Sequence, residues 1–138
     1  MKQSGTVKIT GEMDEEIFSK IKSALSDLYK KTNSVYVDLD MTSTFGLKKI
    51  SRFYMCYNLR SMVIPSSVEY IDSELFISSR YFSSISVDTL NENYSSVDGV
   101  LYSKDLKQLL FFPCGKRQYS FTVPDGVETI AHGAFREC

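Results

Sequence analysis

Ile64-Pro65-Ser66-Ser67-Val68-Glu69-Tyr70-Ile71 and Val123-Pro124-Asp125-Gly126-Val127-Glu128-Thr129-Ile130 align without gaps, 59 positions apart. In both copies an extended apolar stretch ends at Pro, which fixes φ and cannot donate a hydrogen bond to a strand ladder. Val and Ile then follow three positions apart, and an aromatic residue, Phe76 or Phe135, comes five positions after the Ile. Such recurrence is typical of repeat proteins, so each copy is predicted to be a strand followed by a turn and a tucked loop.

Apolar pairs on the predicted strands recur at intervals of 25, 23 and 36 residues, in the order Val37/Leu39, Met62/Ile64, Ile85/Val87 and Phe121/Val123. A repeat unit of 23 residues accounts for the first two intervals. The third interval is 13 residues longer and predicts an insertion. Residues 94–115 supply it, because two apolar runs, 97–102 and 108–113, flank a polar turn in the manner of a β-hairpin.

The first third of the chain has a different organisation. Residues 6–10 alternate β-branched and polar side chains and predict a short strand, and residues 35–40 predict a second one with polar outward positions. Between them, apolar residues at helical spacing predict one long helix, with Asp14 as its N-cap. The stripe consists of Ile17, Ile21, Ala24, Leu25 and Leu28. Its polar face mixes both charge signs, which favours packing on a core over binding to a membrane surface.

Composition limits the class of protein. The 138 residues are 43% apolar and 24% charged, values that suit one soluble globular domain over residues 1–138. A net charge of −1 argues against nucleic acid as a partner. No apolar run is long enough for membrane insertion or for a signal peptide. The three cysteines, Cys56, Cys114 and Cys138, have no CxxC spacing, so we expect reduced thiols with neither a disulfide framework nor a zinc site.

These residues resemble the BspA-like leucine-rich repeats of bacterial surface proteins, particularly the treponemal type. Residues 123–138 follow the repeat of that family almost fully, residues 88–115 are similar to its recurrent hairpin insertion, and residues 1–45 are similar to its N-terminal cap. The resemblance implies an α/β leucine-rich-repeat solenoid with short parallel strands, a strand-helix cap and a β-hairpin insertion. Its parts are the cap with the first strand (1–45), repeats (46–93), the insertion (94–115) and a last, incomplete repeat (116–138).

Three departures from the family pattern predict local differences. The loop that ends at Cys56 is two residues shorter than the one that ends at Cys138, so Phe53 or Met55 is expected to fill the place of the usual aromatic residue. Ser79 replaces the buried Cys of the repeat. Leu106 lies in the hairpin turn where the family often has Gly, which predicts a different turn or left-handed strain.

No residues are predicted to be catalytic, to bind a cofactor or to bind a metal. The single histidine, His132, lies in a repeat loop and is expected to be exposed without partners. Asp88, Asn91, Asn93 and Asp98 lack the Gly and the closing Glu of a calcium loop, so we interpret them as turn residues.

Function in repeat proteins usually resides on the face formed by outward strand positions. The predicted partner-binding residues are therefore Tyr36, Asp38, Asp40, Val63, Ser84, Ser86, Asp88 and Thr122. A merely solvated sheet face is an equally weighted alternative. Family resemblance implies adhesion of a bacterial surface protein to host or matrix proteins, and hence a cell-surface or secreted location that the sequence itself does not display.

A rival prediction is a self-associating module. The chain stops where the next strand of the repeat should begin, so the last repeat is expected to leave apolar side chains and a strand edge uncovered. Dimerisation is then predicted through residues 119–138, with Phe121, Val123, Val127, Ile130, Phe135 and Cys138 in the interface. Cys138 is also expected to be available for an intermolecular disulfide. An enzyme is disfavoured because no constellation of titratable groups is visible.

Overall fold

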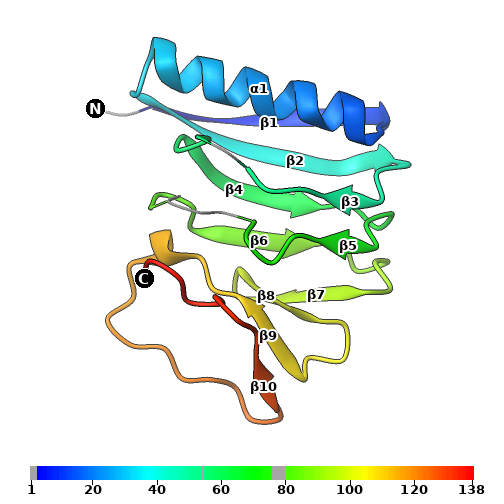
Figure 1. The fold of residues 1–138 in the computed structure, drawn as a ribbon, viewed down its shortest axis with the longest axis vertical. Coiled ribbons are helices and arrows are strands. Elements are labelled where there is room, and N and C mark those ends of the chain that lie inside the picture. Colours follow the sequence, from blue (N-terminus) through cyan, green and yellow to red (C-terminus); the bar gives the residue numbers. More distant parts are fainter. Residues whose placement is uncertain (1–2, 54, 76–79) are drawn as a thin grey trace.

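Four parallel strands form the largest sheet of the protein, seen in a computed structural model that describes residues 3–53, 55–75 and 80–138. The strands are β1 (Gln3–Glu12), β2 (Val35–Phe45), β4 (Leu59–Ile64) and β6 (Ser84–Val87), in the order β1-β2-β4-β6. Each neighbouring pair is parallel, so the chain returns across one face of the sheet after every strand. Figure 1 shows these segments stacked one after another along the molecule. Strands β1 and β2 are longer than the sequence pattern predicted.

One helix, α1 (Glu15–Lys31), lies along β1 and β2 (Figure 1). The Asp14 side chain caps it by accepting a 2.8 Å hydrogen bond from the Ile17 amide, as predicted. The apolar stripe is rotated from the predicted one, because Phe18 and Leu25 are the buried residues and Ile17 is 41% exposed. In the part of the chain that the structure describes, no helix has the length and apolar character needed to cross a membrane.

Alternation along the strands separates a core face from an outer face. The buried residues of β2 are Val37, Leu39 and Met41, with Thr44 further along. The buried residues of β4 and β6 are Leu59, Met62, Ile64 and Ile85. Burial of these side chains beneath α1 and the returning segments supplies the main hydrophobic stabilisation. The side chains between them point to the opposite face, which stays half-buried or exposed.

A second ladder runs along the returning segments. Strands β3 (Lys49–Ile50) and β5 (Tyr70–Ile71) pair in parallel, and the Lys48 carbonyl accepts hydrogen bonds from the amides of Glu69 and Tyr70. The same arrangement recurs 59 positions later, where β10 (Thr129–Ile130) pairs in parallel with β9 (Gln108–Phe111). The 59-residue sequence repeat is therefore also a repeat of hydrogen bonds, in which β9 occupies the place of β3.

The segment predicted as a hairpin contains three antiparallel strands, β7 (Tyr94–Val97), β8 (Val100–Ser103) and β9. The sequence pattern placed 97–102 in one strand, but Asp98 and Gly99 both have positive φ, at 50° and 77°, and form a turn within that run. Leu106 has a φ of 61°, the left-handed strain that its position predicted. Phe53 is buried and fills the loop before Cys56, whereas Met55 is 39% exposed.

Two predictions for the C-terminal segment are wrong. Phe121 and Val123 form no strand, since residues 117–128 carry no strand in the structure, and the four-stranded sheet ends at β6. The amide of Ile85 on β6 instead donates to the carbonyl of Gly99, so β7 and β8 occupy that edge. Cys114 and Cys138 are not reduced thiols but form a disulfide across 24 positions. It joins the 3₁₀ turn η1 (Cys114–Lys116) to the C-terminal residue (Figure 1).

The described residues form two hydrophobic clusters in this arrangement. The larger lies between the sheet, α1 and the returning segments, and it includes Cys56, which is a reduced thiol as expected. The smaller surrounds Val100, Tyr102, Leu109, Phe112 and Ala134, with Phe121 and Phe135 packed against it. The predictions for Phe76 and Ser79 fall on residues outside the described part of the chain.

Candidate functional site

The outer face of the four-stranded sheet gathers most of the predicted partner-binding residues. Tyr36, Asp38 and Asp40 lie on β2, Val63 on β4, and Ser84 and Ser86 on β6, with Asp88 directly after β6. Register places them in rows across the strands: Asp38 pairs with Ser61 and Ser61 with Ser84, while Asp40 pairs with Val63 and Val63 with Ser86. Thr122 is exposed but lies in the segment without strand, so the structure does not bring it to this sheet.

An ion pair crosses this face between β2 and β4. The Arg60 guanidinium donates from Nε to Oδ1 of Asp38 at 2.9 Å, and its Nη2 donates to the other carboxylate oxygen. Ser61 Oγ donates to the same Oδ1 at 2.6 Å. The hydrogen bonds from Arg60 and then from Ser61 lower the pKa of the Asp38 carboxyl below its usual value. Asp38 therefore holds the planar guanidinium of Arg60 in one orientation at the surface.

A groove of about 330 Å³ opens beside this pair, at the amino-terminal end of the strands. Its lining comes from separate segments of the chain and consists of Tyr36, Arg60, Tyr81, Ser83, Gly115 and Arg117. The rings of Tyr36 and Tyr81 lie 5.1 Å apart in a tilted arrangement. The Arg117 guanidinium lies 6.0 Å from the centre of the Tyr81 ring, a distance at which a cation is attracted to the ring face. We call this set the tyrosine-arginine groove.

Gly115 fixes one wall of the tyrosine-arginine groove. Its amide donates to the carbonyl of Phe82 at 2.9 Å. A Cβ at this position would lie 2.6 Å from the Phe82 carbonyl oxygen and 2.7 Å from the Tyr81 carbonyl carbon, closer than backbone contacts permit. Only glycine allows this approach, and it sets Arg117, with a φ of 51°, over Tyr81. Sequence pattern did not indicate Arg60, which lies at the register shift between β2 and β4, or Tyr81 and Arg117, which are joined by the backbone approach at Gly115.

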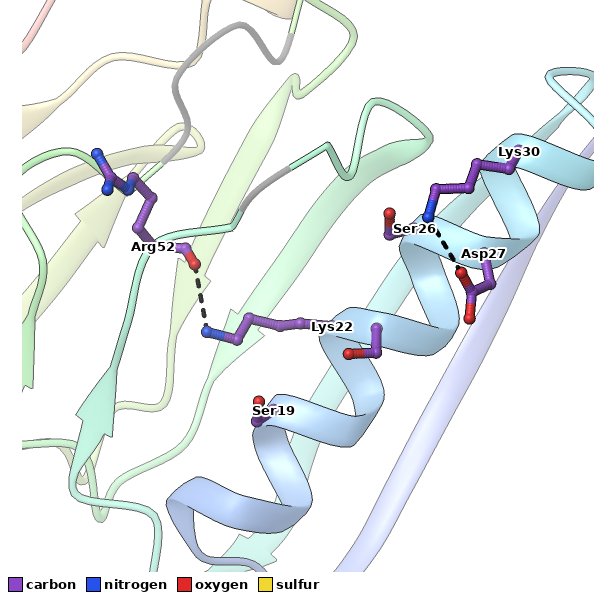
Figure 2. Close-up of a pocket in the computed structure, with 7 residues that line it drawn as sticks. Ser19, Lys22, Ser26, Asp27, Lys30 and Arg52 are labelled. Carbon is purple, nitrogen blue, oxygen red and sulfur yellow. Dashed lines mark hydrogen bonds and ion pairs between the residues drawn. The ribbon is translucent and has the colours of Figure 1, made fainter.

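A second groove, of about 370 Å³, lies on the helix side of the molecule (Figure 2). Figure 2 shows Lys22 reaching from α1 toward the backbone of Arg52, while Lys30 and Asp27 pair along the helix. Lys22 Nζ donates to Ser51 Oγ at 2.5 Å and to the Arg52 carbonyl at 3.2 Å, and it lies 5.2 Å from the centre of the Phe18 ring. Burial lowers the pKa of Lys22. Its ammonium group therefore already has protein partners, and this groove is open and polar with no aromatic side chain in its lining.

Of the residues considered for catalysis or metal binding, His132 is exposed and Asn91 has a structural role. Asn91 is fully buried: its amide nitrogen donates to the carbonyls of Pro65 and Val68, and its Oδ1 accepts from the amides of Asn93 and Tyr94. Within the described ranges no three His, Cys, Asp or Glu side chains gather as they would around a metal ion.

Three of the residues predicted for self-association pack against the smaller hydrophobic cluster, and Val123 is half-buried in the segment without strand. Phe121, Val127 and Phe135 are half-buried against it, and Ile130 is 51% exposed. The Phe135 ring stacks on Phe112 with centroids 5.1 Å apart. Cys138 was expected to be available for an intermolecular disulfide, and that expectation is wrong because its sulfur is bonded to Cys114.

Comparison with known proteins agrees with this geometry. Residues 16–107 match the family described as BspA type leucine rich repeat region, in six copies. A leucine-rich repeat protein from Eubacterium ventriosum has a similar structure, with 28% identity and a TM-score of 0.61 over 75% of this chain and 31% of that one. The pneumococcal vaccine antigen PcpA is also similar, with 28% identity and a TM-score of 0.53 over 75% of this chain and 24% of its own. The chain thus spans less than a third of the length of either of those two structures. No curated protein matches it significantly.

Proposed function

Because this chain belongs to the family of BspA type leucine-rich repeats, we infer that it acts as a protein-interaction module and uses the outer face of its parallel sheet as the binding surface. In this interpretation the stacked segments form a solenoid, with β1 and α1 as its N-terminal cap and β7 to β9 as an insertion. We propose no catalytic role, because the grooves at Lys22 and at Arg60 contain no nucleophile activated by a base.

The tyrosine-arginine groove is the observation that carries the proposal. Tyr and Arg are the residue types that contribute most binding energy at protein interfaces, because their large side chains exclude water and make directed hydrogen bonds. Here two of each meet at one end of the sheet face, and Arg60 is already oriented by Asp38. The rows of small polar side chains beside them leave the face flat enough for a partner to lie on.

Adhesion is the finer form of this proposal. The structures with similar repeats include a pneumococcal vaccine antigen, and the disulfide between Cys114 and Cys138 suits an oxidising compartment outside the cytosol. We propose that the chain is displayed or secreted by a bacterium and contacts host or matrix proteins.

Surface plasmon resonance tests the function directly. The purified chain is immobilised and exposed to a panel of extracellular-matrix proteins, alongside the outer-face variants Val63→Lys and Ser86→Lys. Lys20→Glu on the exposed side of α1 is the control. We expect at least one matrix protein to bind, with at least tenfold weaker binding to either outer-face variant and no change in the control. Equal binding by all variants would exclude the sheet face, and absence of binding to every matrix protein would contradict adhesion.

Self-association through the C-terminal segment is a second proposal, favoured by the exposure of Ile130 at 51% and of the whole Tyr119 side chain. Because Cys138 is engaged, such a dimer would be non-covalent. Size-exclusion chromatography with light scattering, over a concentration series with and without reductant, tests it. A dimer that survives reductant and is lost in Ile130→Lys supports the proposal, and a monomer at all concentrations refutes it.

A further inference from the structure

We propose that the tyrosine-arginine groove binds an acidic side chain, a Glu or Asp carboxylate presented by a protein partner. The proposal rests on the proposed function, because it names the chemistry that the same sheet face recognises. It concerns Tyr36, Arg60, Tyr81 and Arg117 in the lining of the groove.

The charges in the groove do not balance. Arg60 is neutralised by Asp38, with which it makes two hydrogen bonds. Arg117 forms no ion pair within residues 3–53, 55–75 and 80–138, and its guanidinium lies over the ring of Tyr81. Neighbouring Lys116 donates to a backbone carbonyl, that of Asp98, rather than to a carboxylate. The groove therefore carries an excess of positive charge, which a carboxylate would complement.

The groove suits a planar anion, such as a carboxylate, that is attached to apolar methylene groups. A guanidinium presents parallel N–H groups that match the two oxygens of a carboxylate. The Tyr36 and Tyr81 rings, 5.1 Å apart, give the groove an aromatic wall on which the methylene groups of a Glu side chain can pack. A volume of about 330 Å³ is sufficient for one or two side chains and too small for a folded domain to enter.

The groove is pre-organised, which reduces the entropy lost on binding. The hydroxyl of Ser61 donates to the Asp38 carboxylate, which in turn orients Arg60. Gly115 holds the chain against Phe82 and thereby places Arg117. The opposite end of the sheet face carries Asp40 and Asp88, so the charges of the face are polarised along the strands. Charge complementarity therefore favours a partner segment whose acidic end lies over the groove and not over Asp40 and Asp88.

An NMR titration of the isotope-labelled full chain tests the inference. The probes are the capped peptides acetyl-triglutamyl amide, acetyl-triglutaminyl amide and acetyl-trilysyl amide, and inorganic phosphate, all at matched ionic strength. We expect saturable shift changes for the amides of Tyr36, Tyr81 and Arg117 with the triglutamyl peptide only. Equal shifts with trilysyl or triglutaminyl peptide, or tighter binding of phosphate, would overturn it.

Matched variants separate the groove from general charge effects. Arg117→Gln removes the unpaired guanidinium and should weaken triglutamyl binding at least tenfold, and Arg117→Lys should recover part of the loss. Arg52→Gln makes the same charge change on the helix side and should leave binding unchanged. Circular dichroism of each variant verifies folding. Equal affinity of Arg117→Gln and the wild type for the triglutamyl peptide would refute the inference. The proposed function is tested independently, by the binding of matrix proteins to the Val63→Lys and Ser86→Lys variants.

Discussion

Opening of the disulfide between Cys114 and Cys138 should loosen the C-terminal segment while leaving the parallel sheet folded. The perturbation is either reduction of the wild-type chain or the double substitution Cys114→Ser and Cys138→Ser. The segment between the two cysteines has little structure of its own, because residues 117–128 carry no strand and β10 has two residues. Its apolar side chains pack against the smaller cluster around Phe112 and Ala134.

The magnitude follows from the loop that the disulfide closes. In the chain-entropy model, a disulfide between residues 24 positions apart lowers the conformational entropy of the open segment and so stabilises the closed state by about 3.4 kcal/mol. That free energy corresponds to a change of about 300-fold in the opening equilibrium. The effect is confined to the segment because the larger cluster, which includes Leu59 and Met62, makes no use of the disulfide.

Amide hydrogen exchange read by NMR measures this opening residue by residue. The amides of Glu128, Ala131 and Ala134, which donate to the backbone carbonyls of Lys107, Leu109 and Ala131, should exchange on the order of 100-fold faster without the disulfide. The amide of Val37 in the parallel sheet, which donates to the Asn58 carbonyl, is the internal control. Agreement between reduced wild type and the double-serine variant excludes an effect of the new hydroxyls. Unchanged exchange at all three amides, or an equal acceleration at Val37, would refute the reasoning.

The remaining predictions concern single side chains. Asn91→Ala should lower the free energy of unfolding, measured in urea, by about 3 kcal/mol, because buried donors and acceptors lose their partners; a loss below 0.5 kcal/mol would contradict this. The pKa of Asp38 is lowered in the folded state by Arg60, so its stabilising contribution is present above the unfolded pKa of about 4 and is lost as pH falls through the folded value. As pH decreases, the free energy of unfolding of Asp38→Asn should therefore fall less steeply than that of Asp125→Asn, and identical slopes would contradict the ion pair. Burial raises the pKa of Cys56 to about 11, so at pH 8 iodoacetamide should label it, by mass spectrometry, only when urea unfolds the chain.

Sequence pattern predicted those parts of the fold that depend on local periodicity. Alternation identified β2, β4 and β6, and the Pro-Val-Ile spacing identified the 59-residue repeat, although residues 70–71 and 129–130, which were predicted as tucked loops, form the short strands β5 and β10. The N-cap at Asp14 followed from its position before an apolar stripe. Each of these signals is a spacing between residues of one short segment. Such spacings depend on the local geometry of the chain and can be recognised from the sequence.

Features that depend on contacts between distant segments escaped prediction. The pairing of Cys114 with Cys138 needs their backbones to meet, and no spacing of three cysteines indicates which two will do so. Apolar alternation predicted a further strand at Phe121, next to β6. Strands β7 and β8 occupy that edge of β6, so the segment around Phe121 cannot pair there. The turn at Asp98 divided a run that looked continuous because Val97 and Val100 flank it.

The candidate site was predicted in part. Tyr36, Asp38, Asp40, Val63, Ser84 and Ser86 lie on one face because strand alternation requires it. Arg60 lies at an irregularity in the pairing of β2 with β4, because Val37 pairs with Leu59 and Asp38 with Ser61. Strand alternation therefore could not assign Arg60 to a face of the sheet. Arg117 enters from beyond β9, and only the backbone contact at Gly115 places it there.

Hydroxyl-radical footprinting of the chain bound to a matrix protein tests the central claim most directly. Among the residues that the structure describes, two tyrosine pairs are comparable: Tyr36 with Tyr81 on the sheet face, 5.1 Å apart, and Tyr29 with Tyr57 beside α1, 5.2 Å apart. We expect that binding protects the first pair from oxidation and leaves the second pair at its unbound rate. Protection of Tyr29 and Tyr57 with unchanged oxidation of Tyr36 and Tyr81 would contradict it.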